Sequence, residues 1–400
     1  MPLRCPPVPP SSSVLTLPSV GRHDAIVVGA GVFGAWTAEH LRRAGKRVLL
    51  VDQAGPANAR ASSGGESRMT RSGYGRDRIY TMMALASLDE WRALSRRSSL
   101  PVFHQTGVLF MFGEMVDYAR DSIAVHRELN LPLQQLDSSE LARRWPQFAL
   151  EGISFGLFEP DFGALMARRG VQEVVRGFVA RGGEYRLARA TPSPDDGYTV
   201  LFEGAPVHAD AVVYACGPWL PRVFPELLGD RIFVTRQEVL FLAPPEGDRA
   251  FEADTLPGWA DFNGGDLYYG FPNLESRGFK IARDHHGAPF DPDAGDRRIS
   301  EEGANLLRAF AARRFPRLAG RPLTEFRVCQ YENSSNGDFL IDRHPTREGA
   351  WLLGAGSGHG FKHGPEVGRM MSELVLGRAA APDPRFTLAS KDTVQRREVL

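Results

Sequence analysis

Two lysines in this sequence share one context and are of a type that could do chemistry. Of the 48 basic residues only four are lysines, and two of these read Gly278-Phe-Lys280 and Gly360-Phe-Lys362. Arginine stays protonated, whereas lysine is a compact charge whose pKa shifts when it is buried. Lys280 and Lys362 therefore indicate a reaction site. The alternative is that their stems lie along apolar surface while the charge reaches water.

A second group of residues could bind a phosphate. Gly29, Gly31 and Gly34 form G-x-G-x-x-G. The first glycine permits a tight turn, the second lets the backbone approach a pyrophosphate, and the third allows a helix to pack closely on a strand. Asp52 stands about where a carboxylate accepts a hydrogen bond from an adenosine ribose, and it would repel a 2′-phosphate. We expect a dinucleotide other than NADP.

The elements around these residues must form a βαβ unit. The apolar stretch 24–28 predicts a buried strand, Ala35, Ala38 and Leu41 continue one face of a helix that ends at Gly45, and 47–51 predicts a second strand. The rest of the chain follows the same alternation. We expect strands at 150–160, 211–215, 267–271, 278–282 and 350–354, and helices at 80–97, 115–145, 164–181 and 365–376.

This order of elements predicts an α/β protein, α+β overall. It indicates a Rossmann-like, discontinuous nucleotide-binding domain with an inserted mixed β-sheet domain for the substrate, because residues 230–330 are rich in β segments. The predicted boundaries are 23–85, 150–228 and 322–385 for the nucleotide-binding domain, 86–149 and 229–321 for the substrate domain, 1–22 for a disordered tail and 386–400 for a C-terminal tail.

Composition excludes several other classes of protein. With 48 acidic residues against 48 basic ones, the chain has no net charge to attract nucleic acid or an anionic membrane, and it has no apolar run long enough to span one. Three cysteines, at 5, 216 and 329, form no disulfide framework and have no metal-ligand spacing, which predicts a reducing, cytoplasmic location. The basic doublets are interpreted as solvated helix faces: 96–97, 168–169 and 313–314.

Several motifs in one order resemble the family of monomeric sarcosine oxidase and the N-methyl-amino-acid oxidases, within the D-amino-acid oxidase superfamily. The resemblance covers about residues 24–380. The motifs are G-x-G-x-x-G, Arg68-x-x-Arg71, Tyr268-Tyr-Gly-Phe-Pro272, Gly278-Phe-Lys280, Val328-Cys-Gln-Tyr331 and Gly356-Ser-Gly-His-Gly-Phe-Lys362. Cys-x-Tyr followed by Gly-His-Gly-Phe-Lys is the specific part, whereas the glycine fingerprint is generic.

The resemblance implies FAD as cofactor. It implies that Cys329 holds the flavin through a thioether to the 8α position and that Arg68 lies close to the flavin ring. Gly356, Gly358, His359 and Gly360 match the loop that serves the flavin, mainly through its backbone. An inert buried residue remains the alternative for a single cysteine.

The resemblance also implies the substrate side of the site. Arg71 and Lys362 match a pair that clamps the substrate carboxylate, and Tyr269 and Tyr331 match aromatic residues that line the substrate, with plain core packing as their alternative. Lys280 matches a lysine that promotes the reaction of reduced flavin with dioxygen, since a fixed cation stabilises the negative charge that develops on oxygen.

The implied activity is the oxidation of secondary amino acids, N-methyl or cyclic, to an imine that water hydrolyses, with release of hydrogen peroxide. The expected partners are a small amino-acid substrate and dioxygen, the expected state is a monomer, and no metal is expected because His359 and His363 lack a third ligand. Asp284 stands where relatives usually carry histidine, with His285 and His286 beyond it. This carboxylate would favour a cationic substrate group.

Three other functions remain open at this point. A flavin dehydrogenase of the same fold would pass its electrons to a partner, and a deglycating oxidase would act on fructosyl amino acids. A dinucleotide-binding protein without turnover would need only the phosphate-binding turn, so the presence of Arg71, Lys280, Cys329 and Lys362 together disfavours it.

Overall fold

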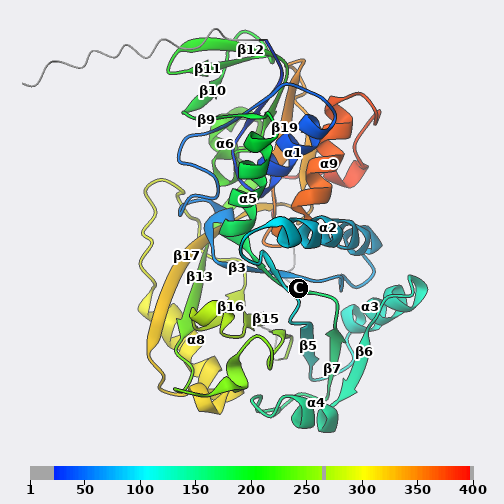
Figure 1. Cartoon of the computed structure of the whole chain (residues 1–400), viewed down its shortest axis with the longest axis vertical. Helices are drawn as coiled ribbons and strands as arrows, with labels where there is room; N and C mark the ends of the chain where they lie inside the picture. Colours follow the sequence, from blue (N-terminus) through cyan, green and yellow to red (C-terminus); the bar gives the residue numbers. More distant parts are fainter. Residues whose placement is uncertain (1–21, 264–266, 397–400) are drawn as a thin grey trace, which may run out of the picture.

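Three sheets organise the part of the chain that the structure describes (Figure 1). The structure is a computed structural model that describes residues 22–263 and 267–396. The predicted disordered tail, with Cys5, lies outside the described residues except for residue 22. No helix within the described ranges is long and apolar enough to cross a membrane.

The centre of the first sheet is parallel, with the strand order β19-β12-β1-β2-β9. Three antiparallel strands extend it: β11 pairs with the start of β12, β10 pairs with β11, and β18 pairs with β19. Its strands come from three separate parts of the chain, so the predicted discontinuous Rossmann-like α/β fold is confirmed. The strands are β1 (His23–Val28), β2 (Val48–Asp52), β9 (Glu184–Leu187), β10 (Ala190–Pro192), β11 (Thr199–Phe202), β12 (Ala205–Tyr214), β18 (Leu340–Arg343) and β19 (Ala350–Gly354).

Apolar residues on both faces explain why these strands form a buried sheet. Within β1, Ala25 and Val27 pack into one core cluster, whereas Ile26 and Val28 pack into another on the opposite face. Such strands need cover on both sides. Helices α1 (Val32–Arg43), α5 (Ala167–Ala180) and α9 (Gly364–Val375) pack together on one face, beside α2 (Arg78–Arg97), and the short helices α6 (Leu220–Val223) and α7 (Pro225–Leu228) contribute to the other.

The second sheet is mixed and lies below the first in Figure 1. One face of it packs on α8 (Glu301–Arg314): Phe279 and Ile281 share a core cluster with Leu307 and Phe310 of that helix. The strand order is β17 (Leu323–Ser334), β13 (Ile232–Leu242), β16 (Phe279–Asp284), β15 (Leu267–Phe271), β14 (Gly258–Asp261), β5 (Val108–Phe112), β7 (Phe155–Glu159) and β6 (Gln134–Asp137).

A three-stranded sheet of β3 (Ser67–Thr70), β8 (Gly163–Met166) and β4 (Phe103–His104) completes the described strands. The prediction of one helix over 115–145 is wrong. The structure has α3 (Asp117–Glu128), then β6, then α4 (Ser138–Arg144). Asn130 adopts a φ of 52° directly before Leu131-Pro132, which ends the first helix, and a capping box of Asp137 with Glu140 starts the second.

Two further expectations need correction. The predicted helix 164–181 begins with strand β8, and α5 starts only at Ala167. The doublet 313–314 is not a solvated face, because Arg314 is 1% exposed and its Nε donates to Asp261 Oδ2 at 2.8 Å. A buried guanidinium needs such a partner, since an unpaired charge there is costly.

The domain boundaries stay a prediction, but sheet membership refines them. β7 and β17 lie in ranges assigned to the nucleotide-binding domain and yet pair within the second sheet. Trp91 lies in a range assigned to the substrate domain and yet packs in the core cluster beside the first sheet. Phe386 in the predicted C-terminal tail is also fully buried in that cluster.

Candidate functional site

The glycine turn between β1 and α1 has the geometry that a dinucleotide phosphate needs. A Cβ on Gly29, whose φ is +106°, would stand 2.3 Å from the Ala215 carbonyl oxygen, and one on Gly34 would stand 1.9 Å from that of Gly29. A Cβ on Gly31 would meet only Ser63 Oγ, at 3.5 Å. Packing thus requires the first and third glycines, while the second leaves room for a ligand at a helix start without acidic residues.

Asp52 at the end of β2 supports this turn. Its carboxylate accepts hydrogen bonds from the backbone N–H groups of Ala30, Ala54 and Gly55, each at 2.8 Å. Burial raises the pKa of Asp52, and these hydrogen bonds oppose that rise. The predicted contact with a ribose remains a prediction, since the structure shows a role for Asp52 within the protein.

Two cavities meet beside Cys329. The larger is about 590 Å³ and the smaller about 100 Å³. The smaller one runs past Gly31, Gly356 and Gly360, and both are lined by Arg68, Cys329, Tyr331, Gly358 and Phe361. The smaller cavity leads from the glycine turn to the larger cavity. This arrangement fits FAD, whose pyrophosphate and flavin ring lie at opposite ends of its ribityl chain.

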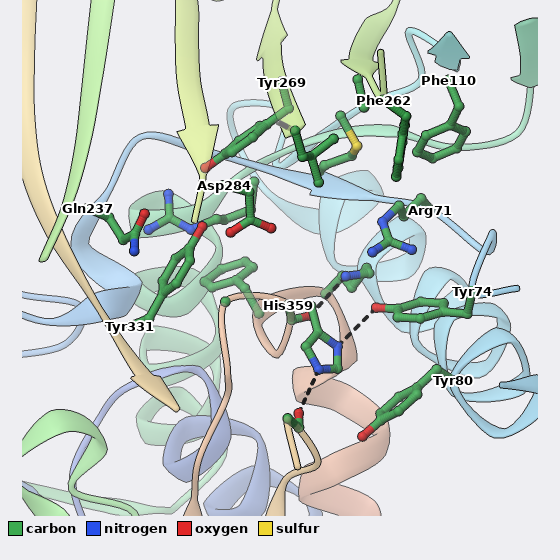
Figure 2. Close-up of a pocket in the computed structure, with 18 of the residues that line it drawn as sticks. Arg71, Tyr74, Tyr80, Phe110, Gln237, Phe262, Tyr269, Asp284, Tyr331 and His359 are labelled. Atoms are coloured by element: carbon green, nitrogen blue, oxygen red, sulfur yellow. Dashed lines mark hydrogen bonds between the residues drawn. The ribbon is translucent and has the colours of Figure 1, made fainter. Parts of the chain in front are cut away.

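The free face of the second sheet forms one wall of the larger cavity. Because side chains alternate along a strand, the face opposite α8 presents every second residue. On β16 these are Lys280, Ala282 and Asp284, of which Lys280 and Asp284 line the cavity. Neighbouring strands add Gln237, Val239, Phe241, Ala260, Tyr269, Arg327, Cys329 and Tyr331. The predicted residues Lys280, Tyr269, Cys329 and Tyr331 share this wall because all lie on one face of one sheet. Figure 2 shows Tyr269 and Tyr331 among them.

Cys329 lies beside an anchored arginine. Arg68 Nη2 is 3.6 Å from Cys329 Sγ and donates to the Ser62 carbonyl oxygen at 2.7 Å, while Nη1 donates to the Ser67 carbonyl oxygen at 2.8 Å. The side chain of Cys329 is partly exposed to both cavities. Arg68 and Cys329 therefore stand together where the two cavities join.

Lys280 is buried in the same wall. It is 3% exposed, and its Nζ donates to the Ser67 carbonyl oxygen at 2.7 Å and lies 5.1 Å from the centre of the Phe271 ring. Burial lowers the pKa of Lys280 well below its ordinary value, and the positive charge of Arg68 lowers it further. Lys280 is thus more easily deprotonated than an exposed lysine.

Arg71 and Lys362 converge on one aromatic ring from different segments. The guanidinium carbon of Arg71 is 4.1 Å from the centre of the Tyr74 ring, and Lys362 Nζ is 5.1 Å from it. Arg71 also donates to the Gly73 carbonyl oxygen and to the Tyr118 hydroxyl, and Lys362 donates to the His359 carbonyl oxygen at 2.9 Å. A partly buried arginine and a buried lysine that both lie against one ring create a place for an anion.

The pKa values of two neighbouring residues, His363 and Tyr269, are also shifted. Burial lowers the pKa of His363 well below its ordinary value, and the charge of Lys362 adds to this effect. Burial raises the pKa of Tyr269 to about 12, Asp284 adds to the rise, and a hydrogen bond with Tyr331 opposes it. His363 is thereby kept neutral and Tyr269 keeps its proton.

The loop after β19 holds its histidine through other side chains. His359 Nδ1 lies 3.2 Å from the Tyr74 hydroxyl and His359 Nε2 lies 3.1 Å from the Gly337 carbonyl oxygen, as Figure 2 shows. The Tyr74 hydroxyl also meets His363 Nε2 at 2.7 Å. Both histidines are therefore engaged within the protein, and among residues 22–263 and 267–396 no three His, Cys, Asp or Glu side chains group for a metal.

The structure brings together most of the predicted site residues, but not all. Nine line the larger cavity: Arg68, Arg71, Tyr269, Lys280, Cys329, Tyr331, Gly358, His359 and Lys362. Gly31, Gly356 and Gly360 line the smaller one, whereas Gly29, Gly34 and Asp52 line neither. Their individual roles remain predictions.

Sequence reasoning missed four residues that shape the site. Tyr118 bonds to Arg71, Ser67 accepts from Lys280, Glu159 accepts from the backbone N–H groups of Ser72 and Gly73, and Glu332 lines the smaller cavity. Glu332 carried a readable signal, because an acidic residue interrupts the otherwise neutral stretch 328–336. The other three are polar residues of common types whose partners lie far away in sequence.

Comparisons with known proteins agree with this architecture. The monomeric sarcosine oxidase of Bacillus sp. (strain B-0618) is 30% identical over 362 residues, which cover 88% of this chain and 92% of that protein. The N-methyl-L-tryptophan oxidase of Salmonella typhimurium strain LT2 is 27% identical over 374 residues, which cover 90% of this chain and 97% of that protein. The solved L-proline dehydrogenase from P. horikoshii has the same fold, with a TM-score of 0.80 at 16% identity over 92% of this chain and 98% of that one.

The family model that matches is that of DAO, FAD dependent oxidoreductase, over residues 24–374. The match covers most of the chain and includes both the glycine turn and the loop after β19. The sequence-based assignment to this group, with FAD as the cofactor, is confirmed. The chain is an enzyme of the DAO family of FAD-dependent oxidoreductases.

Proposed function

We propose that this enzyme oxidises secondary amino acids, N-methylated or cyclic, to imines that water hydrolyses, with dioxygen as acceptor and hydrogen peroxide as product. The observation that carries the proposal is the pair of cations, Arg71 and Lys362, over the Tyr74 ring. A carboxylate is the anion that a planar fork and a point charge fix together. Two relatives are named as oxidases of sarcosine and N-methyl-L-tryptophan, which supports an amine that carries a carboxylate.

The residues of this chain bind and orient the substrate. Arg71 and Lys362 hold the carboxylate from one side, and the buried wall that bears Tyr269 and Tyr331 excludes water from the other. Fixing the carboxylate restricts the orientation of the neighbouring C–N bond, which lowers the entropy cost of reaction. FAD, when bound, would supply the two-electron acceptor.

Lys280 supports an oxidase over a dehydrogenase. Its Nζ is held by the Ser67 carbonyl oxygen and lies in the cavity wall, so its position does not depend on a bound substrate. In its protonated form it stabilises negative charge that develops on dioxygen. The lowered pKa means that this form is lost at a lower pH than for an exposed lysine.

Cys329 supports covalent attachment of the flavin. Its sulfur stands at the junction of the cavities beside Arg68, and it forms no disulfide with another cysteine of the described residues. The covalent bond, the monomeric state and the cytoplasmic location all remain predictions. In the deglycating alternative, Arg71 and Lys362 would bind the carboxylate of a fructosyl amino acid instead.

The experiment compares acids with their methyl esters. Purified enzyme is mixed with N-methyl and cyclic amino acids, with their methyl esters and with primary amino acids, and flavin bleaching without oxygen and peroxide release with oxygen are measured. We expect the secondary amino acids to react and the esters to lose at least about tenfold in kcat/KM, because a charged hydrogen bond contributes about 1.5–3 kcal/mol. Equal rates for acid and ester would refute the carboxylate clamp.

A further inference from the structure

Asp284 is a carboxylate that the mechanism above leaves unused. It is the last residue of β16 and lies four residues beyond Lys280 on the same face of the strand, so it too lines the larger cavity. Figure 2 shows its carboxylate in the cavity, near Tyr269 and Tyr331, with Arg71 on the far side. It comes from the wall of the second sheet, whereas Arg71 follows β3.

One oxygen of this carboxylate has no partner. Asp284 Oδ1 is buried and accepts no hydrogen bond from the described residues. Within residues 22–263 and 267–396, no basic side chain stands within 4.0 Å of Asp284, and His285 Nδ1 instead meets the Arg283 carbonyl oxygen. Asp284 as a whole is partly exposed and borders the larger cavity, so a cationic ligand there would form a charge-assisted hydrogen bond with its carboxylate.

We propose that Asp284 binds a second cationic group of the substrate, so that the enzyme prefers secondary amino acids with a positively charged side chain. This inference rests on the proposed function and names its substrate class. The carboxylate of such a substrate would meet Arg71 and Lys362, and the distant ammonium would meet Asp284. Opposite charges on opposite walls of one cavity match a ligand that carries both charges.

The reacting amine is a poorer partner for Asp284. Oxidation requires the lone pair of that nitrogen, and an unpaired carboxylate beside it would hold it in the protonated form. Distance along the strand argues the same way. At about 3.3 Å per residue, the Cα of Asp284 lies about 13 Å from that of Lys280, the residue proposed to act on dioxygen. A cation at Asp284 therefore belongs to a part of the substrate away from the reacting bond.

Arg71 forms no ion pair with Asp284, although the two charges attract: burial lowers the pKa of Arg71, and nearby groups that include Asp284 raise it above its ordinary value. Its guanidinium is engaged by the Gly73 carbonyl oxygen, the Tyr118 hydroxyl and the face of the Tyr74 ring. No ion pair joins Arg71 to any carboxylate among the described residues. The two charges thus stay available to the two ends of one substrate.

The test uses the FAD-loaded enzyme and matched ligands. Nα-methyl-L-lysine and its neutral counterpart Nα-methyl-L-norleucine are compared by kcat/KM. The non-oxidisable pair 6-aminohexanoate and hexanoate is compared by dissociation constant, from the change that binding causes in the flavin spectrum. We expect the cationic member of each pair to be favoured by about tenfold to a hundredfold, since a charged hydrogen bond contributes about 1.5–3 kcal/mol.

The variants are Asp284→Asn and a matched control, Asp121→Asn. Asp121 lies on α3 and lines the same cavity, so its substitution removes an equal charge elsewhere. Asp284→Asn should abolish the preference and leave the neutral ligands unchanged, whereas Asp121→Asn should keep the preference. The inference is overturned if wild type shows no preference, if the preference survives in Asp284→Asn, or if that variant weakens neutral and cationic ligands equally.

The two binding constants also separate this inference from the proposed function. If no secondary amino acid is oxidised, the proposed function fails, yet 6-aminohexanoate still reports whether Asp284 holds a cation. If neutral secondary amino acids are oxidised as fast as cationic ones, the proposed function stands and the role of Asp284 fails.

Discussion

Glu332 on β17 makes the stability of this protein depend on pH. The residue is 7% exposed, and its carboxyl group accepts hydrogen bonds from the backbone N–H groups of Ala355 and Gly356, while Oε1 has no partner. Burial raises the pKa of Glu332 from 4.5 to about 7 even though those two hydrogen bonds lower it. Replacing Glu332 with glutamine removes the titration and keeps the shape and the acceptor oxygen.

The magnitude and its sign follow from the two pKa values. The folded protein binds this proton more tightly than the unfolded chain, so the stabilisation is full below about pH 4.5 and disappears as the pH rises through about 7. A rise from 4.5 to about 7 corresponds to about 3 kcal/mol in total, because each pKa unit is 1.36 kcal/mol. Between pH 5 and pH 8, we expect wild type to lose about 2.5 kcal/mol relative to Glu332→Gln.

The assay is denaturant unfolding of both proteins across this pH range, with and without bound FAD. Other titrating groups are common to both proteins, so the difference in the free energy of unfolding isolates Glu332. The exposed Glu246 serves as control, and Glu246→Gln should follow wild type at every pH. The prediction is wrong if the free energy of unfolding changes with pH in the same way for wild type and Glu332→Gln. In that case water reaches the carboxyl group, or the backbone donors fully offset its burial.

Three other predictions concern Cys329, Lys280 and Arg314. Wild-type flavin should stay with the pellet after acid precipitation, and Cys329→Ser should release it to the supernatant. In stopped-flow experiments Lys280→Met should slow reoxidation by about a hundredfold to a thousandfold and reduction far less. Wild-type reoxidation should slow as the pH rises through the lowered lysine pKa. Arg314→Met, which leaves Asp261 buried and unpaired, should lower the free energy of unfolding by about 3–5 kcal/mol in denaturant titrations.

The features that the sequence could predict are local ones. The glycine turn, the βαβ unit and the paired strands β15 and β16 depend on residue types within a few positions of each other, and the structure confirms them. Even the break in the predicted helix 115–145 was readable, because Leu131-Pro132 and the box of Asp137 with Glu140 are adjacent signals. The prediction of a single helix was wrong because it continued the helical periodicity through these two signals.

The features that the sequence could not predict depend on partners far away in the chain. Arg314 looks like any arginine in a basic doublet until Asp261, 53 residues earlier, meets it in the core. Tyr118 reaches Arg71 across 47 residues, and Lys280 meets Ser67 across 213. These contacts join separate elements, α8 with β14, α3 with the segment after β3, and β16 with β3, and no residue pattern within one element specifies which element lies beside it.

The scarcity of lysine gains a physical explanation from these contacts. Lys280, Lys362 and Lys391 are at most 4% exposed, and each donates from Nζ to a backbone carbonyl oxygen, of Ser67, His359 and Arg385 respectively. A compact ammonium fits beside a single carbonyl group, whereas the broad guanidinium fork would leave donors unpaired in the same space. Three of the four lysines thus lie where the core allows only a small cation, whereas Lys46 is exposed.

That explanation also limits what lysine scarcity can indicate about function. Lys391 has the same burial and the same kind of partner, and burial lowers its pKa to about 8, yet it does not line either cavity. Burial and a carbonyl partner are therefore common to structural and functional lysines. What separates Lys280 and Lys362 from Lys391 is that both border the larger cavity, together with Arg71 and Cys329. Their place beside this cavity therefore indicates chemistry at Lys280 and Lys362, whereas the repeated Gly-Phe-Lys context alone does not.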